Sequence, residues 1–181
     1  MSENEVHDPN AILESLYEQY TKDTLVDEST SFPTVPTGKY TIQPDKRDVF
    51  PDGDTREKPV KALVGRQYAS LSAAVQKDGR KLGRLFIKVS WVERRGEKGG
   101  LDKASQLWGQ LMNAFNAKGK SAGAVLELAL QYPFDVSVSE QYIDEAGVWH
   151  TVTTNEQRTA AREQGRNLVN VIQGISKTKT E

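Results

Sequence analysis

The feature that most restricts the fold of this chain is the turn signal Asp78-Gly79, which stands between two stretches of alternating apolar and polar residues. Asp-Gly readily adopts the positive φ angles of the tight turns that join antiparallel strands. In the stretches 60–76 and 81–95, alternate residues point to opposite faces of an extended chain. One face then carries Leu71, Ala73, Val75, Leu85, Ile87 and Val89. The sequence therefore predicts a long β-hairpin with one apolar face.

The same patterns predict the other elements. Alternation predicts strands at 38–43, 134–139 and 148–152, and the three prolines within 44–59 favour a long loop there. N-capping residues followed by helically spaced apolar residues predict helices that begin after Asp8, Asp102, Ser121 and Thr154, the last running to Ile172. This order favours an α+β fold that is mainly antiparallel β. We expect an oligonucleotide-binding (OB-like) five-stranded barrel, with a helix between strands three and four and flanking N- and C-terminal helices.

Three regions are expected along the chain: an acidic N-terminal arm with a short amphipathic helix (1–36), an OB-like nucleic-acid-binding domain (37–153), and a C-terminal helix and tail (154–181). Charge is also divided unevenly along the chain. Residues 37–121 carry eighteen Lys and Arg against nine Asp and Glu, a net +9, whereas residues 1–36 carry one against eight. A concentrated block of positive charge is typical of a segment that contacts a polyanion.

Aromatic residues are interleaved with these cations, as a single-stranded nucleic-acid surface requires, because bases stack on rings while phosphates pair with charges. On the two hairpin strands, the polar and aromatic rows predict one binding groove, extended by the glycine-rich loop that follows. The predicted nucleic-acid-binding residues are Arg66, Tyr68, Arg80, Lys81, Arg84, Phe86, Lys88, Trp91, Arg94, Arg95 and Lys98. Two alternatives stay open: the row is the solvated outer face of an ordinary sheet, and Trp91 belongs to the core.

Other chemistry finds little support. The chain has no cysteine and only two histidines, far apart in sequence, so neither a metal nor a cofactor is predicted. Residues 114–121 have the relaxed spacing of a phosphate-binding loop, but a helix rather than a buried strand precedes them. No serine or histidine stands in a catalytic pattern, so no catalytic residue is assigned. No apolar run approaches the ~20 residues of a membrane helix, and the acidic N-terminus differs from a signal peptide. We expect a cytoplasmic, non-enzymatic protein.

The order of elements resembles that of small phage-encoded single-stranded DNA-binding proteins with an oligonucleotide-binding fold. The resemblance covers roughly residues 38–152 and is carried by Gly38-Lys39-Tyr40, by residues 79–86, by the helix over 107–115, and by Tyr132-Pro133-Phe134-Asp135-Val136. It implies a sequence-tolerant protein that supports phage DNA replication or recombination in the host cytoplasm. Its expected partners are single-stranded DNA and possible replication or recombination proteins, with homo-oligomers possible.

A second hypothesis belongs to a different class. The terminal helices predicted around Leu13–Tyr20 and Leu168–Ile172 could pack between subunits, as in a phage structural or assembly protein that contacts protein rather than nucleic acid. Both hypotheses remain open on the sequence.

Overall fold

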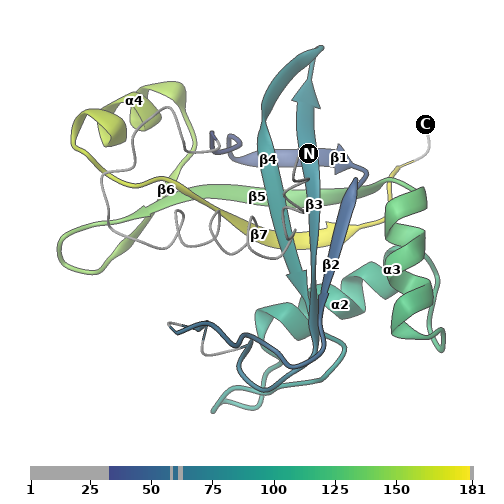
Figure 1. The fold of residues 1–181 in the computed structure, drawn as a ribbon. Helices are drawn as coiled ribbons and strands as arrows, with labels where there is room; N and C mark the ends of the chain where they lie inside the picture. Colours follow the sequence, from purple (N-terminus) through teal and green to yellow (C-terminus); the bar gives the residue numbers. More distant parts are fainter. Residues whose placement is uncertain (1–32, 58, 61–62, 180–181) are drawn as a thin grey trace, which may run out of the picture.

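The computed structural model describes residues 33–57, 59–60 and 63–179. This part of the chain forms seven strands in two antiparallel sheets, together with three helices (Figure 1). The elements are β1 (Gly38–Ile42), β2 (Lys46–Phe50), β3 (Tyr68–Lys77), β4 (Arg80–Val89), α2 (Lys103–Ala114), α3 (Ala122–Gln131), β5 (Phe134–Ile143), β6 (Trp149–Val152), α4 (Asn155–Glu163) and β7 (Val169–Ser176).

Strand β5 is the centre of the first sheet. It pairs with β1 along its first half, where Ile42 lies opposite Phe134, and with β6 at its far end, where Ile143 lies opposite Trp149. Strand β7 pairs with the other edge of β5. In the second sheet, β3 lies between β2 and β4. The long hairpin β3–β4 runs across the direction of β5 and β7 (Figure 1).

One apolar core joins the two sheets. The alternating residues of the hairpin, such as Leu71 and Ile87, meet Phe134 and Val136 of β5, and all four are fully buried. Helix α2 adds Leu111 and α3 adds Val125 to the same core. A sheet must bury its apolar face against another layer, so the two sheets and the two helices stabilise each other.

Several local predictions are confirmed. Asp78 and Gly79 have φ angles of 52° and 73°, as a tight turn between β3 and β4 requires. Asp102 and Ser121 cap α2 and α3, because each side chain accepts a hydrogen bond from the backbone amide three residues on. Thr154 and Gln157 form a capping box at the start of α4.

The predicted five-stranded barrel is wrong. The described residues form two separate antiparallel sheets and no closed barrel. Two strands that the sequence did not predict, β2 and β7, account for the difference between five strands and seven. Strand β2 lies inside residues 44–59, which the prolines had indicated as a loop, and it pairs along β3. The chain leaves the first sheet near Pro44, because β1 and β2 on either side of it belong to different sheets.

The predicted helix through Ile172 is also wrong. Helix α4 ends at Glu163, and Gly165 follows with a φ of 71°, a left-handed conformation that stops a helix. Residues 169–176 then pair with β5 as strand β7. Helix α4 is therefore the last helix of the described chain. The N-terminal helix predicted after Asp8 lies outside the described residues.

Gly83 marks a close approach between distant parts of the chain. A Cβ atom added at this position of β4 would lie far inside van der Waals contact with the backbone carbonyl oxygen of Pro33. The neighbouring Val35 is fully buried in the core beside it. The segment that precedes β1 is therefore packed onto β4 at a point that only glycine allows.

We expect Gly83→Ala to lower the free energy of unfolding by about 1–3 kcal/mol, because a backbone atom must shift to admit the methyl group. Gly109→Ala is the matched control. Gly109 lies within α2 with no neighbouring atom within 4 Å of the added Cβ, so this change should raise stability by ~0.5–1 kcal/mol. Chemical denaturation followed by fluorescence measures both. Equal stability of Gly83→Ala and the wild type would contradict the close approach.

Candidate functional site

A cavity of about 360 Å³ opens between the two sheets, where β4 and β7 are edge strands. The first turns of α2 and the loop after β2 line its other sides. The lining residues are Phe50, Arg56, Val60, Leu63, Tyr68, Ser70, Arg84, Phe86, Lys88, Asp102, Lys103, Ala104, Leu107, Asn170, Val171 and Ile172. Its size is that of a pocket for a small organic group, and its lining is mostly apolar with cations at several points.

The hairpin supplies the aromatic wall. The register places Phe86 of β4 opposite Ser72 of β3, and Lys88 opposite Ser70, so that the two predicted rows adjoin on one face. Phe86 is half-buried and lines the cavity. Tyr68, at the start of β3, is buried and lies flat on Phe50 of β2, with ring centroids 4.5 Å apart and planes 9° from parallel. The stacked pair therefore forms a rigid aromatic support beside the more accessible ring of Phe86.

Four cations line the cavity, and the ion pairs of Arg56 and Arg84 are both with aspartates. Arg56 makes two hydrogen bonds to Asp54, at 2.8 and 2.6 Å, and Arg84 makes a two-point ion pair with Asp45. Lys103 Nζ donates to the carbonyl oxygen of Gln173 at 3.0 Å and is exposed. A backbone carbonyl leaves the ammonium charge uncompensated, so Lys103 remains available to an anion at the rim.

Lys88 is the cation most affected by its surroundings. Burial lowers the pKa of its ammonium group to about 7, and the nearby positive charge of Arg56 acts in the same direction. Asp54 opposes this shift only weakly. An anion entering the cavity would favour the charged form of Lys88.

Arg66 has a structural role. It is buried, its Nη1 forms an ion pair with Asp102, and its Nη2 donates to the carbonyl of Val92 at 2.5 Å and to Ser105 at 2.8 Å. Asp102 also caps α2. Arg66 therefore ties the segment before β3 to the start of α2, and its partner Asp102, rather than Arg66 itself, lines the cavity.

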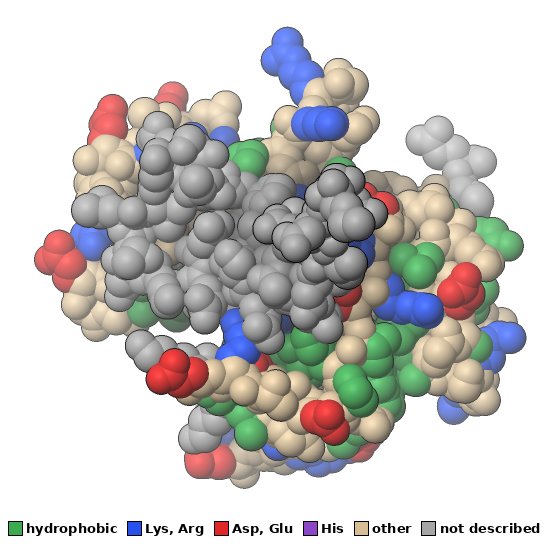
Figure 2. Space-filling view, in the orientation of Figure 1, with side chains coloured by type: hydrophobic (Ala, Val, Ile, Leu, Met, Phe, Trp, Pro, Cys, Tyr) green, Lys and Arg blue, Asp and Glu red, His purple; other side chains and the backbone are tan. Residues whose placement is uncertain are grey.

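The other predicted residues lie at the two ends of the hairpin. Arg80 and Lys81 are exposed at its tip, where Lys and Arg side chains project from the body (Figure 2). At the opposite end, Trp91 packs on Trp108 with ring centroids 5.6 Å apart and donates to Gln67 at 3.0 Å. The open alternative of a core role fits Trp91 better, since it packs against the apolar core.

The loop after β4 holds the last three predicted residues. Arg94, Arg95 and Lys98 are exposed. Arg94 donates to the carbonyl of Val64, and Arg95 donates to that of Gly99 within the loop. The structure therefore brings Tyr68, Arg84, Phe86 and Lys88 together in the cavity, and it places the remaining predicted residues elsewhere.

Sequence reasoning missed several lining residues. Phe50 and Arg56 lie in the segment that the prolines indicated as a solvated loop, where Asp54 is in fact buried. Lys103 is the first residue after a predicted cap and carried a usable signal, since it extends the basic segment into α2. Asn170 and Val171 carried no signal, because their stretch was predicted to be helical.

Other kinds of site find no support in the described part of the chain. Within it, no three His, Asp or Glu side chains gather where they could hold a metal ion. None of the helices there combines the length and the apolar character that crossing a membrane requires. Comparison with protein-family models, with curated proteins and with solved structures gives no match for this chain. The assignment of the site therefore depends on its geometry.

Asp54 gives the cavity wall a dependence on pH. Burial acts to raise the pKa of this carboxyl group, but the hydrogen bonds from Arg56 and from the amide of Val60 outweigh it and lower the pKa to about 2 from the ordinary 3.8. Because the folded state holds the carboxylate ionised, its contribution to stability is full above pH ~4 and is lost as the pH falls towards 2.

We expect Asp54→Asn to destabilise the fold by on the order of 1–2 kcal/mol at pH 7, with the deficit shrinking between pH 4 and pH 2. Denaturant unfolding of variant and wild type across this range measures it. Asp52→Asn, an exposed acid of the same loop, is the control and should change stability by less than ~0.5 kcal/mol throughout. A deficit for Asp54→Asn that stays constant from pH 7 to pH 2 contradicts the assignment.

Proposed function

We propose that this protein binds single-stranded DNA with little sequence preference and catalyses no reaction on it. The observation that carries the proposal is the joint lining of one cavity by the Phe86 ring, the stacked Phe50–Tyr68 pair and the cations Lys88 and Lys103. A base has a flat apolar face and its phosphate has a negative charge, so the two kinds of lining residue match the two parts of a nucleotide.

The rings have different tasks in this proposal. Phe86 is the half-buried ring, and we assign base stacking to it. Tyr68 is only 4% exposed, so it holds the wall in place with Phe50. We assign the phosphates to Lys88 and Lys103, because both line the same cavity as the Phe86 ring. Arg56 and Arg84 line it too, and each already forms an ion pair with an aspartate. The site is therefore suited to one or two nucleotides, with the hairpin tip and the loop over 94–98 as outlying contacts.

The biological setting that we propose follows from the sequence resemblance alone. It is the replication or recombination of phage DNA in the cytoplasm of the host, with replication or recombination proteins as further partners. An unpaired strand is the form of DNA whose bases are free to enter a cavity.

A second candidate function is protein contact within a phage assembly. It is favoured by the end of the β5–β6 hairpin, where Val148 and Trp149 are 53% and 56% exposed and Ile143 is 39% exposed. Of the terminal helices on which this hypothesis first depended, the C-terminal one is a strand. The exposed hairpin end now carries the alternative.

Binding of labelled oligo-dT, followed by fluorescence anisotropy at several salt concentrations, tests the proposed function. We expect Phe86→Ala to weaken binding by roughly 5- to 100-fold with an unchanged salt slope, because a lost stack is worth ~1–3 kcal/mol. Lys103→Ala should instead reduce the slope of log affinity against log salt by about 0.7, the value for one phosphate of a single strand.

Lys120→Ala is the matched control for Lys103→Ala. Lys120 is an exposed lysine in the turn before α3, outside the cavity lining, and its removal should leave the slope unchanged. No binding at low salt would sink the proposal and leave the assembly role as the better candidate. Equal effects of the two lysine changes would show that charge alone, without this cavity, produces the binding.

The pKa of Lys88 predicts a pH dependence of binding. The charged ammonium form binds phosphate, and it is depleted as the pH rises through about 7. Affinity for oligo-dT should therefore fall between pH 6 and pH 8.5. Lys88→Arg should abolish this fall, since a guanidinium stays charged over the whole range. The same anisotropy titration at fixed ionic strength measures both proteins, and an identical pH profile for the two would remove Lys88 from the site.

A further inference from the structure

The segment that precedes β1 enters the described structure at the wall of the cavity. The Asn170 side chain lines the cavity and also binds both backbone groups of Val35, accepting from its amide at 2.8 Å and donating to its carbonyl at 2.7 Å. Two residues earlier, the carbonyl of Pro33 lies against Gly83, next to Arg84 of the lining. Residues 1–32 are therefore tethered beside the site.

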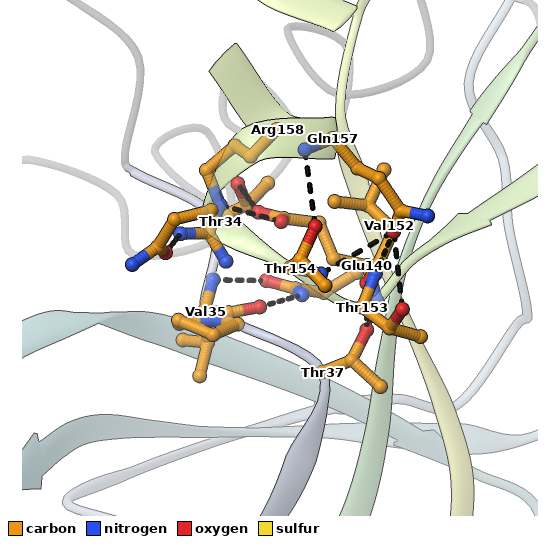
Figure 3. A network of polar contacts seen from close by, with 12 residues as sticks. Thr34, Val35, Thr37, Glu140, Val152, Thr153, Thr154, Gln157 and Arg158 are labelled. Carbon is orange, nitrogen blue, oxygen red and sulfur yellow. Dashed lines mark hydrogen bonds and ion pairs between the residues drawn. The ribbon is translucent and has the colours of Figure 1, made fainter. Parts of the chain in front are cut away.

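This entry point is fixed by a row of residues across the first sheet. Val152, Glu140 and Asn170 lie side by side on β6, β5 and β7. Thr34 donates to the Glu140 carboxylate, and the Thr37 hydroxyl donates to the Val152 carbonyl at 2.5 Å and accepts from the amide of Glu140 at 2.8 Å (Figure 3). Together with Asn170, these contacts hold residues 34–37 in one position.

Both the negative charge and the apolar residues of segment 1–32 complement the lining of the cavity. Residues 1–32 carry eight acidic residues and a single lysine. The cavity is lined by one acid and by four cations, of which Arg56 and Arg84 form ion pairs with aspartates. The segment also carries apolar residues at helical spacing, namely Ile12, Leu13, Leu16, Tyr17 and Tyr20. The lining offers Leu63, Phe86, Leu107 and Ile172 to such a stripe.

We propose that residues 1–32 bind in the cavity of their own chain and compete there with the nucleic acid, so that the segment inhibits binding until a strand displaces it. This rests on the proposed function of the cavity. The thirteen residues from Thr21 to Pro33 span up to ~43 Å when extended, which is long compared with the dimensions of a cavity of about 360 Å³. A short tether gives an effective concentration near the millimolar range, so weak docking is sufficient.

The first test compares two full-length variants that lose the same charge. One carries Glu14→Gln, Glu18→Gln and Asp23→Asn within the segment. The other carries Glu145→Gln, Glu156→Gln and Glu163→Gln, at exposed positions away from the cavity. We expect the segment variant to bind oligo-dT at least ~10-fold more tightly than the control variant at low salt. Equal affinities of the two would overturn the competition.

The second test detects docking without any nucleic acid. The chain has no cysteine, so Ser15→Cys gives a single site for a spin label. We expect the label to broaden the NMR signals of Phe86, Lys88 and Val171, and to spare Trp149 at the hairpin end. Absence of broadening at low salt overturns the inference. Broadening only in a mixture of labelled and isotope-enriched chains would assign the docking to a second copy and overturn it as stated.

The two tests separate the inference from the proposed function. Broadening in a protein that does not bind oligo-dT would support docking of the segment while defeating the role of the cavity in nucleic-acid binding. Binding of oligo-dT without broadening, and with equal affinities of the two charge variants, would support the proposed function and defeat the inference.

Discussion

The rest of this structure depends on the ion pair between the buried carboxylate of Glu140 and Arg158. The carboxylate lies at the centre of β5 with no exposed surface, and Arg158 of α4 donates to it at 2.6 Å. Thr34 donates a further hydrogen bond to the other oxygen of the carboxylate. An ionised group in a protein interior is tolerated only when it is paired, and removal of one partner typically costs ~3–5 kcal/mol. Helix α4, the middle of β5 and the entry of residues 34–37 must therefore form together.

The contacts around Glu140 also help to fix the two strands that line the cavity. Asn170 stands opposite Glu140 in the sheet and binds Val35, so the edge of β7 and the segment before β1 have a fixed relation. Gly83 brings β4 against that segment from the second sheet. The two edge strands that line the cavity are thus held by contacts to a common segment, in addition to the apolar core between the sheets. A binding site at a junction of this kind is largely formed before any ligand arrives.

Local signals predicted the elements whose residues lie close together in sequence. The Asp78-Gly79 turn, the caps at Asp102 and Ser121, and the Thr154 capping box each depend on contacts within a few residues. Strands β2 and β7 could not be found in this way. Residues 168–172 carry apolar side chains whose spacing fits a helix as well as a strand, and only pairing with β5 decides between them. The barrel failed because sheet closure is a non-local property.

In the candidate site, too, the sequence predicted only the features that depend on neighbouring residues. Strand parity sufficed to place Phe86 and Lys88 on one face, because alternation along a strand is local. It could not show that Tyr68 would be buried under Phe50, nor that Arg66 would be committed to Asp102. Those partners come from other segments, and a count of charges along the sequence does not reveal them.

The net charge counted along the sequence is larger than the charge that is not already paired with an acid, and this limits how strongly the cavity can attract an anion. Residues 37–121 carry a net +9, yet Arg56, Arg66 and Arg84 are each paired with an aspartate of the same segment. Paired cations can still contribute to the field around the cavity, but an approaching phosphate must compete with a carboxylate already in contact. In the proposed function, Lys88 and Lys103 are the cations assigned to phosphate. The proposed affinity for nucleic acid then draws on the aromatic ring and on several weak outer contacts, and moderate affinity is what the proposed competition by residues 1–32 requires.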